Sequence, residues 1–277
     1  MTKLMEVAHT ELCLTAVRHI RRLRGGSQSH LIAASDGGLY VTKFQNNPQH
    51  VRVLANEMLV GQLGRRLRLP VAPVDVIDVP KWLIAGTREL CFEVGHAVFP
   101  CSAGKQLASR YVSDAAGSEV REHLPDDVLA TRVGNLLDFP RILVLDKWTA
   151  NCDGRQVVFS APHGTESYTA TFVDQGFCFN AGAWDFPDGA LRGTYARTVV
   201  YRTVTDWGAF EPALSRAESM CSEEIWRYAH RIPAEWYEHD SDGLARICEG
   251  LYKRRLLIRD LITAFRKSPR NPFPNWT

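Results

Sequence analysis

Hydrophobic and polar residues alternate with period two over several short stretches in the first 112 residues. The clearest is LYVTKF at 39–44, where Leu39, Val41 and Lys43 share one face. Period two is the repeat of a β-strand with one buried face, and Gly, Pro and Asp residues bound the stretches. The predicted strands are 31–34, 39–44, 71–82, 89–99 and 105–112.

One stretch in this half of the chain has the repeat of a helix instead. Asn47-Pro48 can open a helix, and Pro70 stops it. The apolar positions between them are Val51, Leu54, Met58, Leu63 and Leu67. Because turn residues dominate the segment SDAAGS at 113–118, we predict a hinge there. Residues 1–113 then form a small antiparallel β lobe that carries one helix.

The rest of the chain, 114–277, is predicted to form a larger and mainly helical lobe. After Pro125, the pair Asp126-Asp127 can cap a helix whose apolar positions continue to Ile142. Further helical patterns cover 215–231 and 243–266. The predicted fold class is therefore α+β with two lobes.

Composition excludes several classes of protein. The net charge is only +2, so nothing in the overall charge indicates a surface for nucleic acid or for a membrane. The seven cysteines lack C-x-x-C spacing, which favours reduced thiols in a cytoplasm. No apolar run approaches about eighteen residues, and Glu6 and Glu11 interrupt the start of the chain. We therefore expect a cytoplasmic protein without a signal peptide, membrane span or direct nucleic-acid binding.

Candidate catalytic residues flank a predicted β-hairpin formed by 156–159 and 168–173. Asp146 and Asn151 precede the hairpin with four residues between them, and Asp174 follows it directly. The protein-kinase catalytic loop has the same spacing from Asp to Asn, and a later Asp-x-Gly completes its magnesium site. By chance, D-x-x-x-x-N also occurs as an Asp-capped turn with a solvated Asn. The intervening hairpin favours the kinase interpretation, because a kinase presents its metal-binding groups from the two ends of such a hairpin.

Two residues of the small lobe fit the same chemistry. Lys43 lies on an apolar strand face, so it must either extend to solvent or meet an anion. Glu57 is an isolated acidic residue beside the apolar stripe of the predicted helix. It suits an ion pair with a strand lysine that holds the α- and β-phosphates, and it suits a solvated helix surface equally well.

A small-residue turn precedes the predicted strands, and its residues are Gly25, Gly26, Ser27 and Gln28. Such a turn lets backbone N–H groups approach phosphate oxygens, although an ordinary hairpin turn explains it as well. The turn, Lys43, Glu57, Asp146 with Asn151, and Asp174 follow one another in the order found in kinases. This order, rather than any single residue, indicates phosphate transfer.

The chain resembles the HipA-type kinases, and more closely the compact stand-alone HipA-like kinases, over both lobes. The strings that carry the resemblance are GGSQSHLI, YVTKFQNNPQH, NEMLVGQLGRRL, LVLDKWTANCDGRQ and VDQGFCFNAG. The resemblance implies a two-lobed protein-kinase-like fold, ATP with magnesium, and transfer of the γ-phosphate to a Ser or Thr hydroxyl of a protein.

The resemblance also implies roles for individual residues. It makes Asp146 the catalytic base or hydroxyl-orienting carboxylate, Asn151 and Asp174 the metal ligands, and Lys43 the phosphate-binding lysine. The nucleotide-covering turn would contain Gly26 and Gln28.

Three departures limit what the resemblance implies. The larger toxins of the family have an additional N-terminal subdomain, so their antitoxin and DNA contacts are not carried over. Whether this chain has a regulatory partner protein is therefore an open question. Leu23 stands where those toxins have an autophosphorylated serine. The basic residue of the toxin loop is displaced, so either His30 or Lys147 could contact the γ-phosphate.

Two alternatives to a protein kinase remain. A catalytically inactive nucleotide-binding scaffold could have the same fold, although the complete Lys, Asp, Asn and Asp set argues against it. A small-molecule kinase would keep the chemistry and change the acceptor. The shape of the surface beside the catalytic carboxylate distinguishes the acceptors, since a broad groove suits a polypeptide and an acidic enclosed pocket suits an aminated small molecule.

Overall fold

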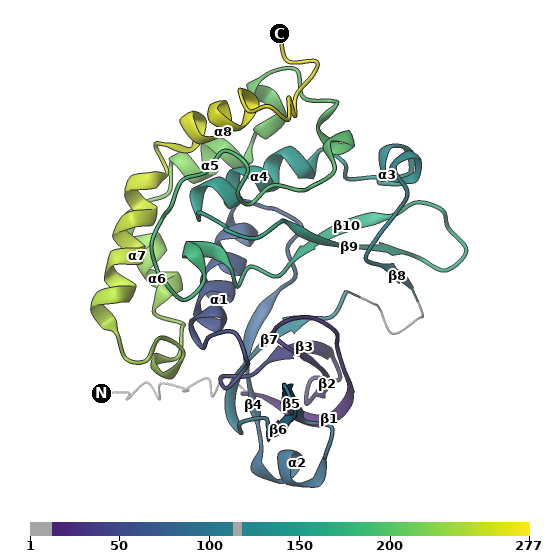
Figure 1. The fold of residues 1–277 in the computed structure, drawn as a ribbon, viewed down its shortest axis with the longest axis vertical. Helices are drawn as coiled ribbons and strands as arrows, with labels where there is room; N and C mark the ends of the chain where they lie inside the picture. The colour runs from purple at the N-terminus through teal and green to yellow at the C-terminus, as the bar shows by residue number, and fades with distance from the viewer. Residues whose placement is uncertain (1–12, 113–117) are drawn as a thin grey trace, which may run out of the picture.

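The computed structural model describes residues 13–112 and 118–277. It has a β-barrel at one end and a cluster of helices at the other, with helix α1 (Arg52–Arg66) next to both (Figure 1). The hinge predicted at 113–118 lies, except for Ser118, outside the described residues. No helix among the described residues is long and apolar enough to cross a membrane.

Five strands close the barrel in the order β1, β2, β3, β7 and β4. Their bounds are β1 Leu14–Arg22, β2 His30–Ala34, β3 Leu39–Lys43, β4 Val74–Val79 and β7 Gly104–Arg110. Neighbouring strands are antiparallel as predicted, except that β1 and β4 pair in parallel, with Leu14 opposite Ile77. This parallel pair closes the barrel, and no local sequence pattern specifies it.

Two of the stretches predicted as single strands each contain two elements. The stretch 71–82 contains β4 and the start of a short helix, α2 (Lys81–Gly86), because Pro80 ends the strand and precedes the helix. The stretch 89–99 forms a separate hairpin of β5 (Cys91–Val94) and β6 (Ala97–Pro100). Gly95 lies in its turn with a left-handed backbone.

Helix α1 is the element around which the two lobes pack. Every residue from Val53 to Gly64 is buried, because the helix contacts β4 and β7 on one side and α4 and α6 on the other. Gly61 permits the close approach of β4, since a Cβ there would lie 2.7 Å from a methyl group of Val74. The helix is shorter than the predicted stretch 47–69, and Asn47 forms a turn before it instead of capping it.

The larger lobe contains the predicted hairpin, and it contains more helices than the hydrophobic repeat of the sequence predicted. Strands β9 (Gln156–Ala161) and β10 (Thr169–Val173) pair antiparallel, which confirms the hairpin, and β8 (Glu119–Arg121) extends the sheet. Each predicted long helix is divided in two. The helices are α3 Asp126–Arg132, α4 Asp138–Trp148, α5 Ala213–Glu218, α6 Ser222–Ala229, α7 Ser241–Arg254 and α8 Ile258–Arg266. The described part of this lobe also contains four 3-10 turns, at Cys178–Asn180, Thr198–Tyr201, Trp207–Phe210 and Ala234–Tyr237.

Candidate functional site

A cavity of about 700 Å³ opens between the barrel and the larger lobe. One wall comes from the small-residue turn, β3 and α1, and the other comes from the open end of the β9–β10 hairpin. The lining includes Gly25, Gly26, Ser27, Lys43, Glu57, Asp153, Arg155, Gln156 and Asp174. Three residues that the sequence places far apart, Lys43, Glu57 and Asp174, therefore meet in one cavity.

Lys43 is the centre of a buried ionic cluster. Its Nζ donates to Oε2 of Glu57 at 2.6 Å and to Oδ1 of Asp174 at 2.8 Å. The side chains of Lys43 and Glu57 are only 7% and 4% exposed, whereas that of Asp174 is 27% exposed. The cluster thus joins β3, α1 and the end of β10, and its solvent-facing member is a carboxylate.

The charged groups of the cluster shift one another's pKa values. Burial lowers the pKa of Lys43, but the carboxylates of Asp174 and Glu57 outweigh burial and raise that pKa above its ordinary value. Burial raises the pKa of Glu57, and the Lys43 ammonium opposes the rise. Burial also raises the pKa of Asp174, but Lys43 more than offsets it, so this pKa is lowered. One ammonium facing two acidic groups leaves Asp174 ionised and able to accept a second cation.

The position of Asp174 keeps one carboxylate oxygen free. It follows β10 with a left-handed backbone, φ 58°, and its Oδ1 accepts from Lys43 and from the Gly176 N–H. Within 13–112 and 118–277, no group hydrogen-bonds to its Oδ2. Directly across the hairpin, Val173 pairs with Gln156, so Gln156 and Asp174 come from the same open end. The Gln156 side chain is exposed and makes no hydrogen bond with the described part of the chain.

The residues of the small-residue turn face two different parts of the protein. Gly25, Gly26 and Ser27 line the cavity, whereas Gln28 does not. The Gln28 side chain bonds both backbone groups of Glu93 on β5, donating to its carbonyl at 2.7 Å and accepting from its N–H at 2.9 Å. Gln28 therefore attaches the turn to the β5–β6 hairpin, and its side chain is directed away from the cavity lining.

The structure places Asp146 and Asn151 behind the cavity wall. Asp146 lies inside α4, its side chain is 1% exposed, and the Arg155 guanidinium binds both of its carboxylate oxygens. Asn151 donates to Oδ1 of Asp146 at 2.9 Å and accepts from the Asp153 N–H at 3.1 Å. Neither residue lines the cavity. The two residues are hydrogen-bonded to each other, and among the described residues no hydrogen bond joins either of them to Lys43 or Asp174.

Residues 17–159 match the model of a protein family described as HipA-like kinase. This chain belongs to the HipA-like kinase family. The matched region begins in β1 and ends in β9, so it covers α1, α4 and all of the barrel except the first three residues of β1. Membership confirms the predicted family and the predicted enzyme class, a kinase that transfers phosphate. The comparison with curated proteins gives no match.

Solved kinase structures share the fold of this HipA-like kinase at low sequence identity. The Golgi casein kinase is 14% identical, with a TM-score of 0.53 over 92% of this chain and 74% of that chain. The hydra Fam20 structure with sugar is 11% identical, with a TM-score of 0.51 and coverages of 94% and 87%. HipA of Shewanella oneidensis MR-1, solved with HipB and operator DNA, is 12% identical, with a TM-score of 0.52 and coverages of 90% and 68%. These likenesses confirm the predicted kinase-like fold.

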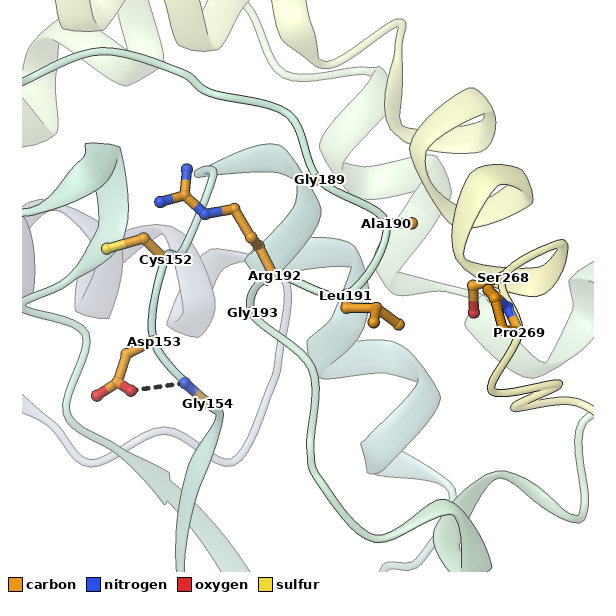
Figure 2. Close-up of a pocket in the computed structure, with 10 residues that line it drawn as sticks. All are labelled: Cys152, Asp153, Gly154, Gly189, Ala190, Leu191, Arg192, Gly193, Ser268 and Pro269. Atoms are coloured by element: carbon orange, nitrogen blue, oxygen red, sulfur yellow. Dashed lines mark hydrogen bonds between the residues drawn. The ribbon is translucent and has the colours of Figure 1, made fainter.

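Sequence reasoning missed two residues of this HipA-like kinase that face the cavity, Asp153 and Gln156. Asp153 is exposed, and its carboxylate accepts from the Gly154 N–H at 2.7 Å. It also borders a second cavity on the far side of the loop (Figure 2). A local signal was present, since Asp153-Gly154 stands one residue before the first hairpin strand. The Asp-to-Asn spacing drew attention to Asp146 and Asn151 instead.

The two basic residues considered for the γ-phosphate, Lys147 and His30, are both buried and outside the cavity lining. Lys147 donates to the carbonyl oxygens of Gly189, Ala190 and Arg192 at 3.2, 2.8 and 2.7 Å. Burial lowers its pKa to about 8. Burial also lowers the pKa of His30 to about 4, with the nearby His19 and Arg22 adding to the effect. Because its ammonium binds three backbone carbonyls, Lys147 holds the segment 189–192 in place.

Proposed function

We propose that this HipA-like kinase transfers the γ-phosphate of ATP, with magnesium, to a Ser or Thr hydroxyl of a protein. The observation that carries the proposal is the cluster of Lys43, Glu57 and Asp174 inside a cavity whose rim holds the exposed carboxylate of Asp153. A phosphate-binding cation, a metal-binding carboxylate and a carboxylate at the acceptor side are the groups that phosphoryl transfer requires.

The cavity residues fit a nucleotide with a divalent cation. Lys43 supplies a fixed ammonium for phosphate oxygens, and Glu57 holds that ammonium in position. The backbone at 25–27 can donate N–H groups to phosphate. A further structure of the Golgi casein kinase contains manganese and ADP, which supports a nucleotide and a divalent metal for this fold.

Asp174 and Gln156 are the residues that would hold the metal. No group of three or more His, Cys, Asp or Glu side chains in the described chain could hold a metal ion by itself. A single carboxylate and an amide fit magnesium, which is bound in such enzymes largely through the phosphates and water. When bound, magnesium would neutralise charge on the phosphates. We assign the amide role to Gln156 in place of Asn151, because both ends of the Asn151 amide are already bonded.

We assign the acceptor-side carboxylate to Asp153 in place of Asp146. A group that orients the acceptor hydroxyl and takes its proton must reach the substrate within hydrogen-bond distance. Asp153 is exposed at the cavity rim, whereas the carboxylate of Asp146 is enclosed by Arg155 and Asn151. The interior carboxylate of Asp146 then keeps Arg155 and the loop in place.

Magnesium-dependent binding tests the nucleotide part of the proposal. Mg-ATP at about 100 times its dissociation constant should stabilise the wild type by roughly 2.7 kcal/mol, which is measured as a rise in melting temperature. Asp174→Ala should abolish the part of this rise that depends on magnesium, because it removes the charged ligand. Asp75→Ala is the matched control, since Asp75 is an exposed carboxylate outside the cavity. An Asp174→Ala protein with the full magnesium-dependent rise would exclude Asp174 as the ligand.

A double-mutant cycle on turnover tests the role of Glu57. Lys43→Met and Glu57→Gln should each reduce turnover severely, and the double variant should be little worse than Lys43→Met. The reason is that Glu57 touches the reaction only through Lys43. Additive losses in the double variant would show that Glu57 acts independently of the lysine.

A further inference from the structure

Asn56 is a buried amide on α1 that has no role in the proposed chemistry so far. The residue is 1% exposed, and the described lining of the nucleotide cavity does not include it. Its Nδ2 donates to three backbone carbonyl oxygens, at 2.8, 3.0 and 2.9 Å, those of Gly176, Cys178 and Ala181. All three lie in the segment 175–181, which follows the proposed metal ligand Asp174. One side chain of α1 therefore holds this segment at three points.

The partners of Asn56 determine which way its amide faces. Its Oδ1 accepts from the indole N–H of Trp184 at 2.8 Å, and an indole N–H can only donate. Backbone carbonyls can only accept, so the NH2 group must face the three of them. An Asp side chain here would place an oxygen against carbonyl oxygens, and a Leu side chain would offer no donor. The site therefore uses both ends of the amide.

The backbone that Asn56 holds has an unfavourable conformation. Left-handed φ angles between 55° and 58° occur at five residues other than glycine, namely Asp174, Phe179, Asn180, Ala181 and Trp184. In this conformation the Cβ atom crowds the backbone, so residues other than glycine persist in it only where the surrounding structure holds them. The bonds from Asn56 fall inside this run of residues. They offset part of the cost of its conformation.

Two hydrogen bonds connect Asn56 to the Asp174 carboxylate through Gly176. The Gly176 carbonyl accepts from Asn56, and the Gly176 N–H donates to Oδ1 of Asp174 at 3.4 Å. The same Oδ1 accepts from Lys43. Gly176 also packs closely on α1, because a Cβ there would lie 3.1 Å from Cβ of Val53. The direction of the remaining oxygen, Oδ2, is therefore controlled from α1.

Adjacent residues of α1 hold the two partners of one ion pair. Glu57 accepts from Lys43 of β3 at 2.6 Å, whereas Asn56 holds the segment that follows Asp174 at the end of β10. Successive side chains of a helix point about 100° apart, so one helix can reach both partners. The separation between the Lys43 ammonium and the Asp174 carboxylate thus depends on one rigid element.

We propose that Asn56 is a positioning residue for magnesium, and that it sets the place and direction of the Asp174 carboxylate relative to Lys43. This inference rests on the proposed function, in which Asp174 is the metal ligand. Asn56 acts through the segment 175–181 and contacts neither metal nor nucleotide. Groups that orient a metal ligand in this way typically account for about tenfold to a hundredfold in metal affinity.

The test is the magnesium dependence of ATP binding. Calorimetry gives the dissociation constant for ATP at a series of free-magnesium concentrations, and the midpoint of this dependence reports the affinity of the site for the metal. Asn56→Leu should raise the midpoint by about tenfold to a hundredfold, because the Asp174 carboxylate loses its alignment. Excess magnesium should restore phosphate transfer by this variant, because the ligand itself is still present.

Gln62→Leu is the matched control. Gln62 is a second buried amide of α1, and within the described chain its side chain bonds the Met58 carbonyl and Arg231. Both Leu variants should lower the free energy of unfolding in urea, since each leaves buried polar partners without an amide. Only Asn56→Leu should shift the magnesium midpoint. A purely structural role for Asn56 would lower stability and leave the midpoint of the folded protein unchanged.

Trp184→Phe covers the case in which Asn56→Leu does not fold. It keeps an aromatic ring and removes the N–H that orients the amide, so the midpoint should rise by about two- to tenfold, the range for one hydrogen bond. An unchanged midpoint in folded Asn56→Leu or, failing that, in Trp184→Phe would overturn the positioning role. The nucleotide assignment would stand if Asp174→Ala still lost its magnesium dependence. A wild type without magnesium-dependent ATP binding would overturn the proposed function and this inference with it.

Discussion

Replacing Asp153 with Asn is expected to reduce phosphate transfer by about a hundredfold to ten-thousandfold, the usual contribution of a positioned general base. This corresponds to about 2.7 to 5.5 kcal/mol of activation free energy. The substitution keeps the size of the side chain and removes its charge, so it can no longer take the acceptor proton. Because Lys43, Glu57 and Asp174 are untouched, the stabilisation by Mg-ATP should survive. The measurement is transfer of labelled γ-phosphate into protein or peptide at saturating Mg-ATP.

Two companion variants make this result specific. Asp75→Asn changes an exposed carboxylate outside both cavities and should transfer phosphate normally. Asp146→Asn should lower the melting temperature, because the buried Arg155 loses its charged partner. Normal transfer by Asp153→Asn, together with lost transfer and unchanged stability in Asp146→Asn, would restore Asp146 as the catalytic carboxylate.

Breaking the buried pair of Arg155 and Asp146 should cause a large loss of stability. Both side chains are almost fully buried, and the Arg155 guanidinium also donates to the Val173 carbonyl at 3.0 Å and to Oε1 of Gln175 at 2.6 Å. Arg155→Met leaves the Asp146 carboxylate buried without its cation, at a cost of about 3 to 5 kcal/mol. The free energy of unfolding from urea denaturation measures this loss.

The double variant Asp146→Leu with Arg155→Met separates an uncompensated charge from lost packing. It removes both charges, so it should recover a substantial part of the stability lost by Arg155→Met alone. Arg197→Met is the matched control, because Arg197 pairs with Asp126, whose side chain is mostly exposed. A loss below about 1 kcal/mol in Arg155→Met would mean that the buried pair behaves like a surface salt bridge.

Local patterns predicted those parts of the site that depend on single elements. Period two placed Lys43 at the end of β3, and the isolated Glu57 on the following helix proved to be its partner. The hairpin pattern placed Asp174 directly after β10. In each case the element that carries the residue has a sequence repeat of its own, so the residue could be located before its partners were known.

The remaining features depend on where an element ends and on what packs against it. The spacing of Asp146 and Asn151 does not reveal that α4 continues to Trp148, which places Asp146 inside a buried helix. The loop that reaches the cavity begins only after that helix, at Asp153. The parallel pairing of β1 with β4 likewise joins residues that are far apart in the sequence, as Leu14 and Ile77 show. Both features are decided by tertiary packing, which short-range patterns do not contain.

The double hydrogen bond between Gln28 and Glu93 has a kinetic consequence for the proposed enzyme. The turn over the nucleotide cannot lift alone, because lifting breaks both bonds or moves the β5–β6 hairpin with it. At about 0.5 to 1.5 kcal/mol for each bond, the added barrier is roughly 1 to 3 kcal/mol. Release of ADP by the proposed enzyme would then be slower than from a turn without these two bonds, and displacement of the β5–β6 hairpin would be part of product release.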